Sequence, residues 1–119
     1  MRKMIHSFSG LNSTPVTQVV SSEGKGGHNR AIYLLDVTQI DAADNWTVAL
    51  KFKADSGNTV SIASIATGVG VSGLMGITAV APFGSNLPFP VPDEVTFTRT
   101  AGASGTTFAG KIYMITGAV

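Results

Sequence analysis

The sequence predicts an all-β protein: an antiparallel β-sandwich or jelly-roll-like fold of roughly seven to eight strands, with an extended N-terminal arm. Apolar and polar residues alternate along several runs of strand length, and segments rich in Gly, Asn, Asp and Ser separate these runs. No run repeats with the helical period of about 3.6 residues. Because 119 residues can enclose one core, we expect an arm over residues 1–13 and a single β-sandwich domain over residues 14–119.

The chain carries little charge for its size. Charged residues make up 13% of it, against roughly 25% in typical soluble proteins, and the mean hydropathy is +0.28. A small domain exposes much of its surface, so this shortage of charge suggests that part of the surface contacts protein. We therefore expect a homotrimer, another homo-oligomer or a place in a larger assembly. The alternative is a monomer coated with Ser, Thr, Gly and Ala.

The first thirteen residues have no clear period. Ile5, Phe8 and Leu11 are isolated among polar residues, with spacings that match neither a strand nor a helix. Such a segment is expected to be an arm that becomes ordered on a neighbouring subunit, or a frayed terminus.

Two strands are predicted next. Residues 15–21 are strand-like, and a glycine-rich loop follows over residues 22–29. Residues 30–40 are apolar on both faces, which is typical of a central or well-covered strand. Asp41 is then placed to cap a single helical turn.

The clearest pattern lies in residues 45–66. Along residues 45–53, apolar side chains alternate with Thr, Ala and Lys, as in a strand with one buried face. Residues 55–58, Asp-Ser-Gly-Asn, are turn formers, and residues 59–65 resume the strand pattern. This stretch predicts a β-hairpin.

The remaining segments alternate between irregular stretches and strands. Four glycines over residues 67–76 predict a long loop or a bulged strand before a strand at 76–81. A proline-rich segment follows, and two strands are then expected at 94–100 and 106–117. The predicted core is Trp46, Val48, Leu50, Phe52, Phe97, Phe108 and Ile112, together with Ile32, Leu34, Ile62 and Met114.

Residues suited to catalysis are few. His6 and His28 are the two imidazoles, one in the arm and one in the glycine-rich loop, and no G-x-S-x-G elbow is present. Residues 55–58 lack the run of oxygen ligands that a calcium loop needs. We expect no enzyme, no cofactor and no metal site.

The sequence also argues against nucleic acid and membrane partners. Basic residues are scattered, and Lys51 and Lys53 should point away from Phe52 and so form no stacking platform. The start of the chain does not resemble a signal peptide, and the apolar stretch 69–81 is too short and too rich in glycine for a membrane span.

Two segments carry a family resemblance. The first segment, residues 31–66, contains "DVT", a strand that ends in the "DSG" turn and a following "IA". The second segment, residues 87–115, has a proline-led strand before a final alternating strand. Together they resemble small β-sandwich virion proteins of tailed bacteriophages. The resemblance covers roughly residues 31–116. It does not cover the arm, and the glycine-rich stretch 67–76 departs from the pattern.

The resemblance implies a non-enzymatic structural protein on the capsid surface of a virion, which decorates or cements the capsid by binding the lattice of the major capsid protein. Members of this group often form trimers, and others are head-tail or tail accessory proteins. The expected capsid or subunit contacts are Arg2, Lys3, Ile5, Phe8, Leu11, Leu74, Met75, Phe83 and Phe89.

Two other functions stay open. A carbohydrate-binding or receptor-binding sandwich would use exposed Tyr33 or Tyr113 as a stacking platform. A small hydrolase would depend on His28, although no motif supports it.

Overall fold

The fold is all-β, as predicted. A computed structural model describes residues 2–12, 14–20, 31–79, 92–102 and 107–116, and these form no helix. The strands are β1 (Arg2–Leu11), β2 (Val16–Val19), β3 (Ala31–Gln39), β4 (Asn45–Lys53), β5 (Thr59–Ala66), β6 (Gly73–Ala79), β7 (Glu94–Ala101) and β8 (Phe108–Thr116). Within the described ranges there is accordingly no helix that could cross a membrane.

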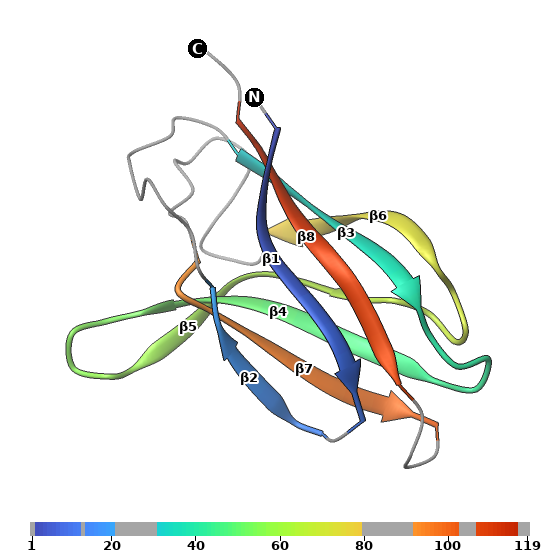
Figure 1. Cartoon of the computed structure of the whole chain (residues 1–119). Coiled ribbons are helices and arrows are strands. Elements are labelled where there is room, and N and C mark those ends of the chain that lie inside the picture. Colours follow the sequence, from blue (N-terminus) through green and yellow to red (C-terminus); the bar gives the residue numbers. More distant parts are fainter. Residues whose placement is uncertain (1, 13, 21–30, 80–91, 103–106, 117–119) are drawn as a thin grey trace.

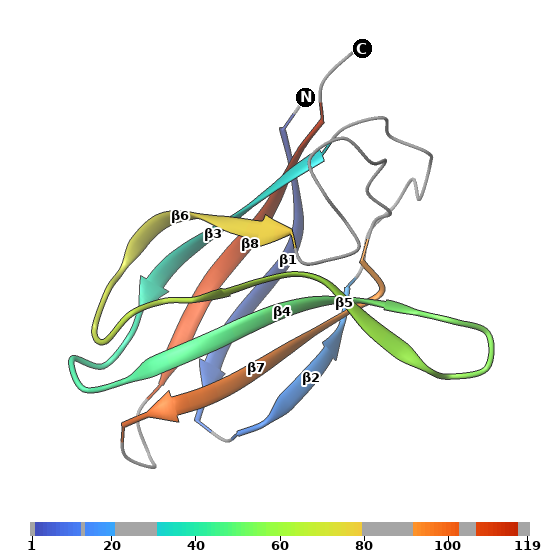
Figure 2. The ribbon, with the colours of Figure 1, turned by 180° about the vertical axis from the view of Figure 1, so that it is seen from behind.

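The strands form two antiparallel sheets, consistent with a β-sandwich (Figure 1). Sheet A has the order β1-β8-β3-β6, and sheet B has the order β5-β4-β7-β2. A short pairing of β5 with β6, Ala63 with Ala79 and Ser64 with Thr78, joins the sheets along one side. Figure 2 shows this junction from behind, where the chain passes from β5 in one layer to β6 in the other.

Side-chain contacts bridge the opposite side of the sandwich, where β1 and β2 are edge strands. His6 Nε2 of β1 lies 2.7 Å from Gln18 Oε1 of β2. The backbone N–H of Arg99 in β7 donates to Thr14 Oγ1 at 2.8 Å, in the link between β1 and β2. The two sheets are thus tied together on both sides, by backbone pairing on one and by side chains on the other.

The prediction of an N-terminal arm over residues 1–13 is wrong for residues 2–11, because these residues form strand β1. This strand pairs along its length with β8, and it buries Ile5, Phe8 and Leu11 in the core. Its register shifts between Met4 and His6 and again between Phe8 and Leu11. Because each such bulge inserts an extra residue, the inward side chains recur at intervals of three instead of two, and no strand period is visible in the sequence.

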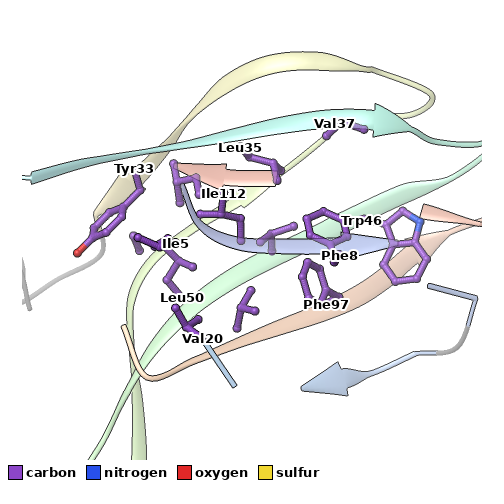
Figure 3. Packing of buried hydrophobic residues seen from close by; sticks show 14 of the residues in the cluster. Ile5, Phe8, Val20, Tyr33, Leu35, Val37, Trp46, Leu50, Phe97 and Ile112 are labelled. Atoms are coloured by element: carbon purple, nitrogen blue, oxygen red, sulfur yellow. The ribbon is translucent and has the colours of Figure 1, made fainter. Parts of the chain in front are cut away.

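One hydrophobic core lies between the sheets (Figure 3). The rings of Trp46 and Phe108 stack with centroids 4.8 Å apart, and Phe8 packs on Phe97 at 4.4 Å. These contacts join sheet A to sheet B through aromatic pairs. The predicted core residues that are confirmed as buried are Trp46, Val48, Leu50, Ile62, Phe97, Phe108, Ile112 and Met114.

For three residues the prediction of a core position was wrong. Ile32 is 59% exposed and Leu34 is half-buried, because β3 turns Tyr33, Leu35 and Val37 inward. Since β3 is apolar at both parities, its sequence does not say which set faces the core.

Phe52 is 40% exposed, although it has the same parity as buried Leu50. The register of β4 on β5 shifts between Leu50 and Lys51, and the β4–β5 hairpin then projects beyond the sandwich (Figure 1). The side of the hairpin that carries Phe52 is therefore only partly covered there.

The predicted hairpin turn is present, whereas the helical turn predicted after Asp41 is an isolated turn without a helix, closed by the N–H of Asp44, which donates to the carbonyl of Asp41 at 3.0 Å. In the hairpin, the N–H of Gly57 donates to the carbonyl of Ala54 at 2.8 Å. Asp41 Oδ1 accepts from the N–H of Ala43 at 3.0 Å, as a residue that opens a turn should. The glycine-rich loop with His28 and the segment with Phe83 and Phe89 lie outside the described residues.

Candidate interaction surfaces

Within the described part of the chain, no group of three or more His, Cys, Asp or Glu is placed to hold a metal ion. His6 bonds to Gln18, and its ring lies beside the Phe8–Phe97 pair, at centroid distances of 6.5 Å and 6.3 Å. Its imidazole is thus engaged in bridging the two edge strands.

A buried ion pair lies at the end of the sandwich where β3 passes to β4. Asp44 is fully buried, and its Oδ2 lies 3.5 Å from Arg99 Nε and accepts a hydrogen bond from Trp46 Nε1 at 3.3 Å. The guanidinium of Arg99 lies 4.8 Å from the centre of the Trp46 ring. The carboxylate and the cation compensate each other's desolvation, and the indole contacts both charges.

The loop of residues 67–72, here called the end loop, rests on this cluster. The N–H of Gly70 donates to the carbonyl of Asp44 at 2.8 Å, and a Cβ at Gly70 would lie 2.6 Å from the carbonyl oxygen of Ala42. Gly70 also has φ +68°, which disfavours any side chain. Only glycine therefore allows the end loop to approach the 41–44 turn this closely.

Further hydrogen bonds hold the start of the end loop. The N–H of Thr67 donates to the carbonyl of Trp46 at 2.8 Å, and Trp46 N–H donates to Thr67 Oγ1 at 3.2 Å. Asn45 Oδ1 accepts from the N–H of Gly68 at 3.1 Å. This anchored loop exposes Val69 (59%) and Val71 (46%), and it is therefore a fixed apolar projection.

A second apolar surface covers the outer side of sheet A and is here called face A. The strand register places Ile32 beside Ile115, and Leu34 between Tyr113 and Gly76, with Met4 on the far side of Tyr113. Asp36 and Lys111 are register partners in the next row. Face A comprises Met4, Ile32, Leu34, Asp36, Leu74, Lys111, Tyr113 and Ile115.

The outer side of sheet B has a different composition. Where β4 pairs with β7, its rows join small and hydrophilic residues: Thr47 with Thr98, Ala49 with Thr96 and Lys51 with Glu94, and the exposed Val19 of β2 lies beside Glu94. An antiparallel sheet with one face in water shows this composition. The apolar side chains on face A are therefore not a general property of this sandwich.

A shallow depression lies near the base of the β4–β5 hairpin and is lined by Val19, Lys53, Ala54, Asp93 and Glu94. Its polar groups already bind one another: Asp93 Oδ2 accepts from the N–H of Lys53 at 2.8 Å, and Lys53 Nζ lies 3.7 Å from Glu94 Oε2. These contacts tie the hairpin to the start of β7.

The expected contact residues have different positions. Ile5, Phe8 and Leu11 are buried, so their assignment to capsid or subunit contacts was wrong. Arg2 and Lys3 lie in β1, and Met75 packs against the core. Leu74 is 65% exposed and belongs to face A, beside the end loop.

The alternative of a glycan-binding sandwich named Tyr33 or Tyr113 as an exposed platform, and Tyr33 is excluded because its side chain is buried. Burial desolvates the phenolate and raises the pKa of Tyr33 well above the usual range. Tyr113 is half-buried on face A.

Comparisons with known proteins give no further assignment: no protein-family model matches this sequence, and no curated protein matches it significantly.

Proposed function

We propose that this protein is a non-enzymatic structural protein of a tailed-phage virion, which decorates or cements the capsid by binding the lattice of the major capsid protein. The observation that carries the proposal is the anchored end loop with exposed Val69 and Val71. The resemblance of residues 31–66 and 87–115 to small virion proteins gives the proposal its biological setting.

The physical argument starts from the cost of association. Burying a valine side chain contributes about 1.5–3 kcal/mol, and a loop that is already ordered loses little conformational entropy when it binds. Hydrogen bonds to Trp46, Asn45 and Asp44 hold the end loop before any partner arrives. A shell presents many equivalent binding sites. Copies joined in an oligomer would bind several of these sites together, which raises the overall affinity of a weak contact of this kind.

The location of the end loop also fits a contact role. It adjoins the last residues of β3, whereas Arg2 and Ile115 pair at the other end of sheet A beside Ile32. The described ends of the chain therefore lie away from the end loop, as Figure 1 shows. A tag on either terminus should leave this loop accessible.

The first test is the presence of the protein in particles. Virus-sized particles sedimented from cultures that produce this chain are probed with an antiserum against the purified protein, and bound antibody is located by immunogold electron microscopy. Gold over the head supports decoration of the capsid, and gold at the neck or tail would favour the alternative of an accessory protein. Recovery only among soluble proteins would contradict a virion role.

The second test concerns the end loop. Val69→Ser combined with Val71→Ser should weaken rebinding to particles stripped of the protein by on the order of tenfold or more, because two apolar contacts are lost. The matched control is Val60→Ser, which changes an exposed valine of the β4–β5 hairpin. Equal binding by both variants would exclude the end loop as the capsid contact.

A further inference from the structure

We propose that face A is a homodimer interface, on which a second copy of this chain packs face to face about a two-fold axis. This surface is distinct from the end loop, and the inference does not depend on the virion role.

The composition of face A favours a protein partner. Ile32 and Leu74 are 59% and 65% exposed, and the register brings them into one surface with the half-buried apolar side chains of β3 and β8. Large exposed apolar patches on small proteins mark interaction sites. The Thr-rich outer side of sheet B shows that the same sandwich can present a polar face to water.

The pattern of charge favours a second copy as that partner. Asp36 and Lys111, one acid and one base, lie side by side within face A. A two-fold axis between them places Asp36 of each copy opposite Lys111 of the other, so the surface is complementary to itself. A partner of one charge sign would attract one of these two groups and repel the other.

The edge strand β1 argues for packing through the face and not through the edge. Two register shifts interrupt β1, between Met4 and His6 and between Phe8 and Leu11. Bulges of this kind disrupt the regular row of backbone groups that edge-to-edge pairing requires. Sheets that pack face to face need only apolar side chains that interdigitate, and face A supplies them.

The first experiment measures the mass of the full chain by light scattering after gel filtration, from micromolar to millimolar concentrations. We expect a dimer whose population rises with concentration. Ile32→Glu should raise the dimer Kd on the order of 100-fold, because it places a carboxylate in an apolar contact. Val60→Glu, at an exposed β-branched residue of sheet B, should leave the Kd unchanged within about threefold.

A mixing experiment tests the two-fold axis. In homodimers of Asp36→Lys, or of Lys111→Glu, like charges would meet across the interface, and both proteins should be monomeric. When the two variants are mixed, opposite charges face each other at both contacts, so a heterodimer should form. Charge interactions within each copy remain repulsive in the mixture, so only an intermolecular contact explains recovery of the dimer.

The outcomes separate clearly. A monomer at every concentration, a trimer, a dimer that Ile32→Glu leaves intact, or a mixture that stays monomeric would each overturn the proposal. Far-ultraviolet circular dichroism and the fluorescence of buried Trp46 confirm that each variant is folded. Because these measurements use purified protein without particles, their result is independent of the immunogold test.

Discussion

Gly102 follows the last residue of β7 and lies against the carboxylate of Asp44. Its φ is +116°, and a Cβ there would overlap Asp44 Oδ1. The carboxylate cannot move away without weakening its contacts with Arg99 and Trp46. A single hydrogen atom in place of a side chain thus permits the buried ion pair.

Gly102→Ala should lower the free energy of unfolding by about 3 kcal/mol, because backbone strain adds to displacement of the buried carboxylate. The control is Gly57→Ala: Gly57 also has a positive φ, of +93°, but no atom lies within 4 Å of its added Cβ. Its cost should be only the strain of about 1 kcal/mol. Urea unfolding followed by Trp46 fluorescence gives both values, and equal losses would contradict the role of the Asp44 contact.

The phenol of Tyr33 links stability to alkaline pH. Burial raises the pKa of Tyr33, whereas the unfolded chain should ionise near the ordinary value of about 10. Below that pH both states keep the proton, and the effect of burial is fully present. Above it only the unfolded state releases the proton, so stability falls as pH rises, by up to about 1.4 kcal/mol per pH unit.

Tyr33→Phe should remove this part of the pH dependence. Urea unfolding of both proteins between pH of about 9 and 11 provides the comparison, since all other groups titrate in both. The difference in unfolding free energy between the two proteins should change with pH only above about 10. A constant difference would mean that the native phenol ionises as readily as the unfolded one.

At the scale of elements, the burial of Phe8 makes β1 a strand of the core and not an arm. Phe8 is buried against Phe97 and Phe108, with ring centroids 4.4 Å and 5.0 Å away. Phe8→Ala should therefore cost about 3–5 kcal/mol of stability. Ser9→Ala, at the exposed neighbouring position, should change stability by less than about 0.5 kcal/mol.

The measurement is again urea unfolding, with circular dichroism to confirm the native fold at zero denaturant. An effect of Phe8→Ala as small as that of Ser9→Ala would contradict the packing of β1. Attachment to particles should not require a free N-terminal arm, because residues 2–11 are already paired with β8.

The sequence predicted those strands whose alternation is regular. Trp46, Val48 and Leu50 occupy alternate positions without a bulge between them, so β4 and its buried face up to Leu50 were predicted correctly, whereas Phe52, beyond the register shift, was not. In β1 the bulges hide the period, and in β3 apolar residues at both parities conceal the inward set. Local pattern therefore identified the strands better than it identified their faces.

The end loop and face A also differed in how far the sequence predicted them. The glycines of residues 67–76 predicted a long loop or a bulged strand, and Leu74 was an expected contact. Val69 and Val71 are exposed in the end loop, and Leu74 is exposed at the start of β6. Face A was not predicted, because it exists only when β1, β8, β3 and β6 are placed side by side in the correct register. Ile32 and Leu34, expected in the core, contribute to face A.

At the scale of the whole molecule, one core couples the two sheets. The buried cluster contains residues of β1, β3 and β8 from sheet A and of β4, β5 and β7 from sheet B. The Trp46–Phe108 stack and the Phe8–Phe97 contact both cross between the layers. Neither sheet can keep its apolar face covered when the other is lost, so the sandwich should unfold as a unit.

Trp46 makes this prediction measurable. It is the only tryptophan, it is fully buried between the sheets, and its fluorescence reports the packing of the core. Far-ultraviolet circular dichroism reports the strands of both sheets. At one protein concentration, kept low so that dimer dissociation does not shift the midpoint, the two urea transitions should coincide. If fluorescence changed at lower urea than circular dichroism, one sheet would persist after the core had opened, and the aromatic contacts could not be what couples the two sheets.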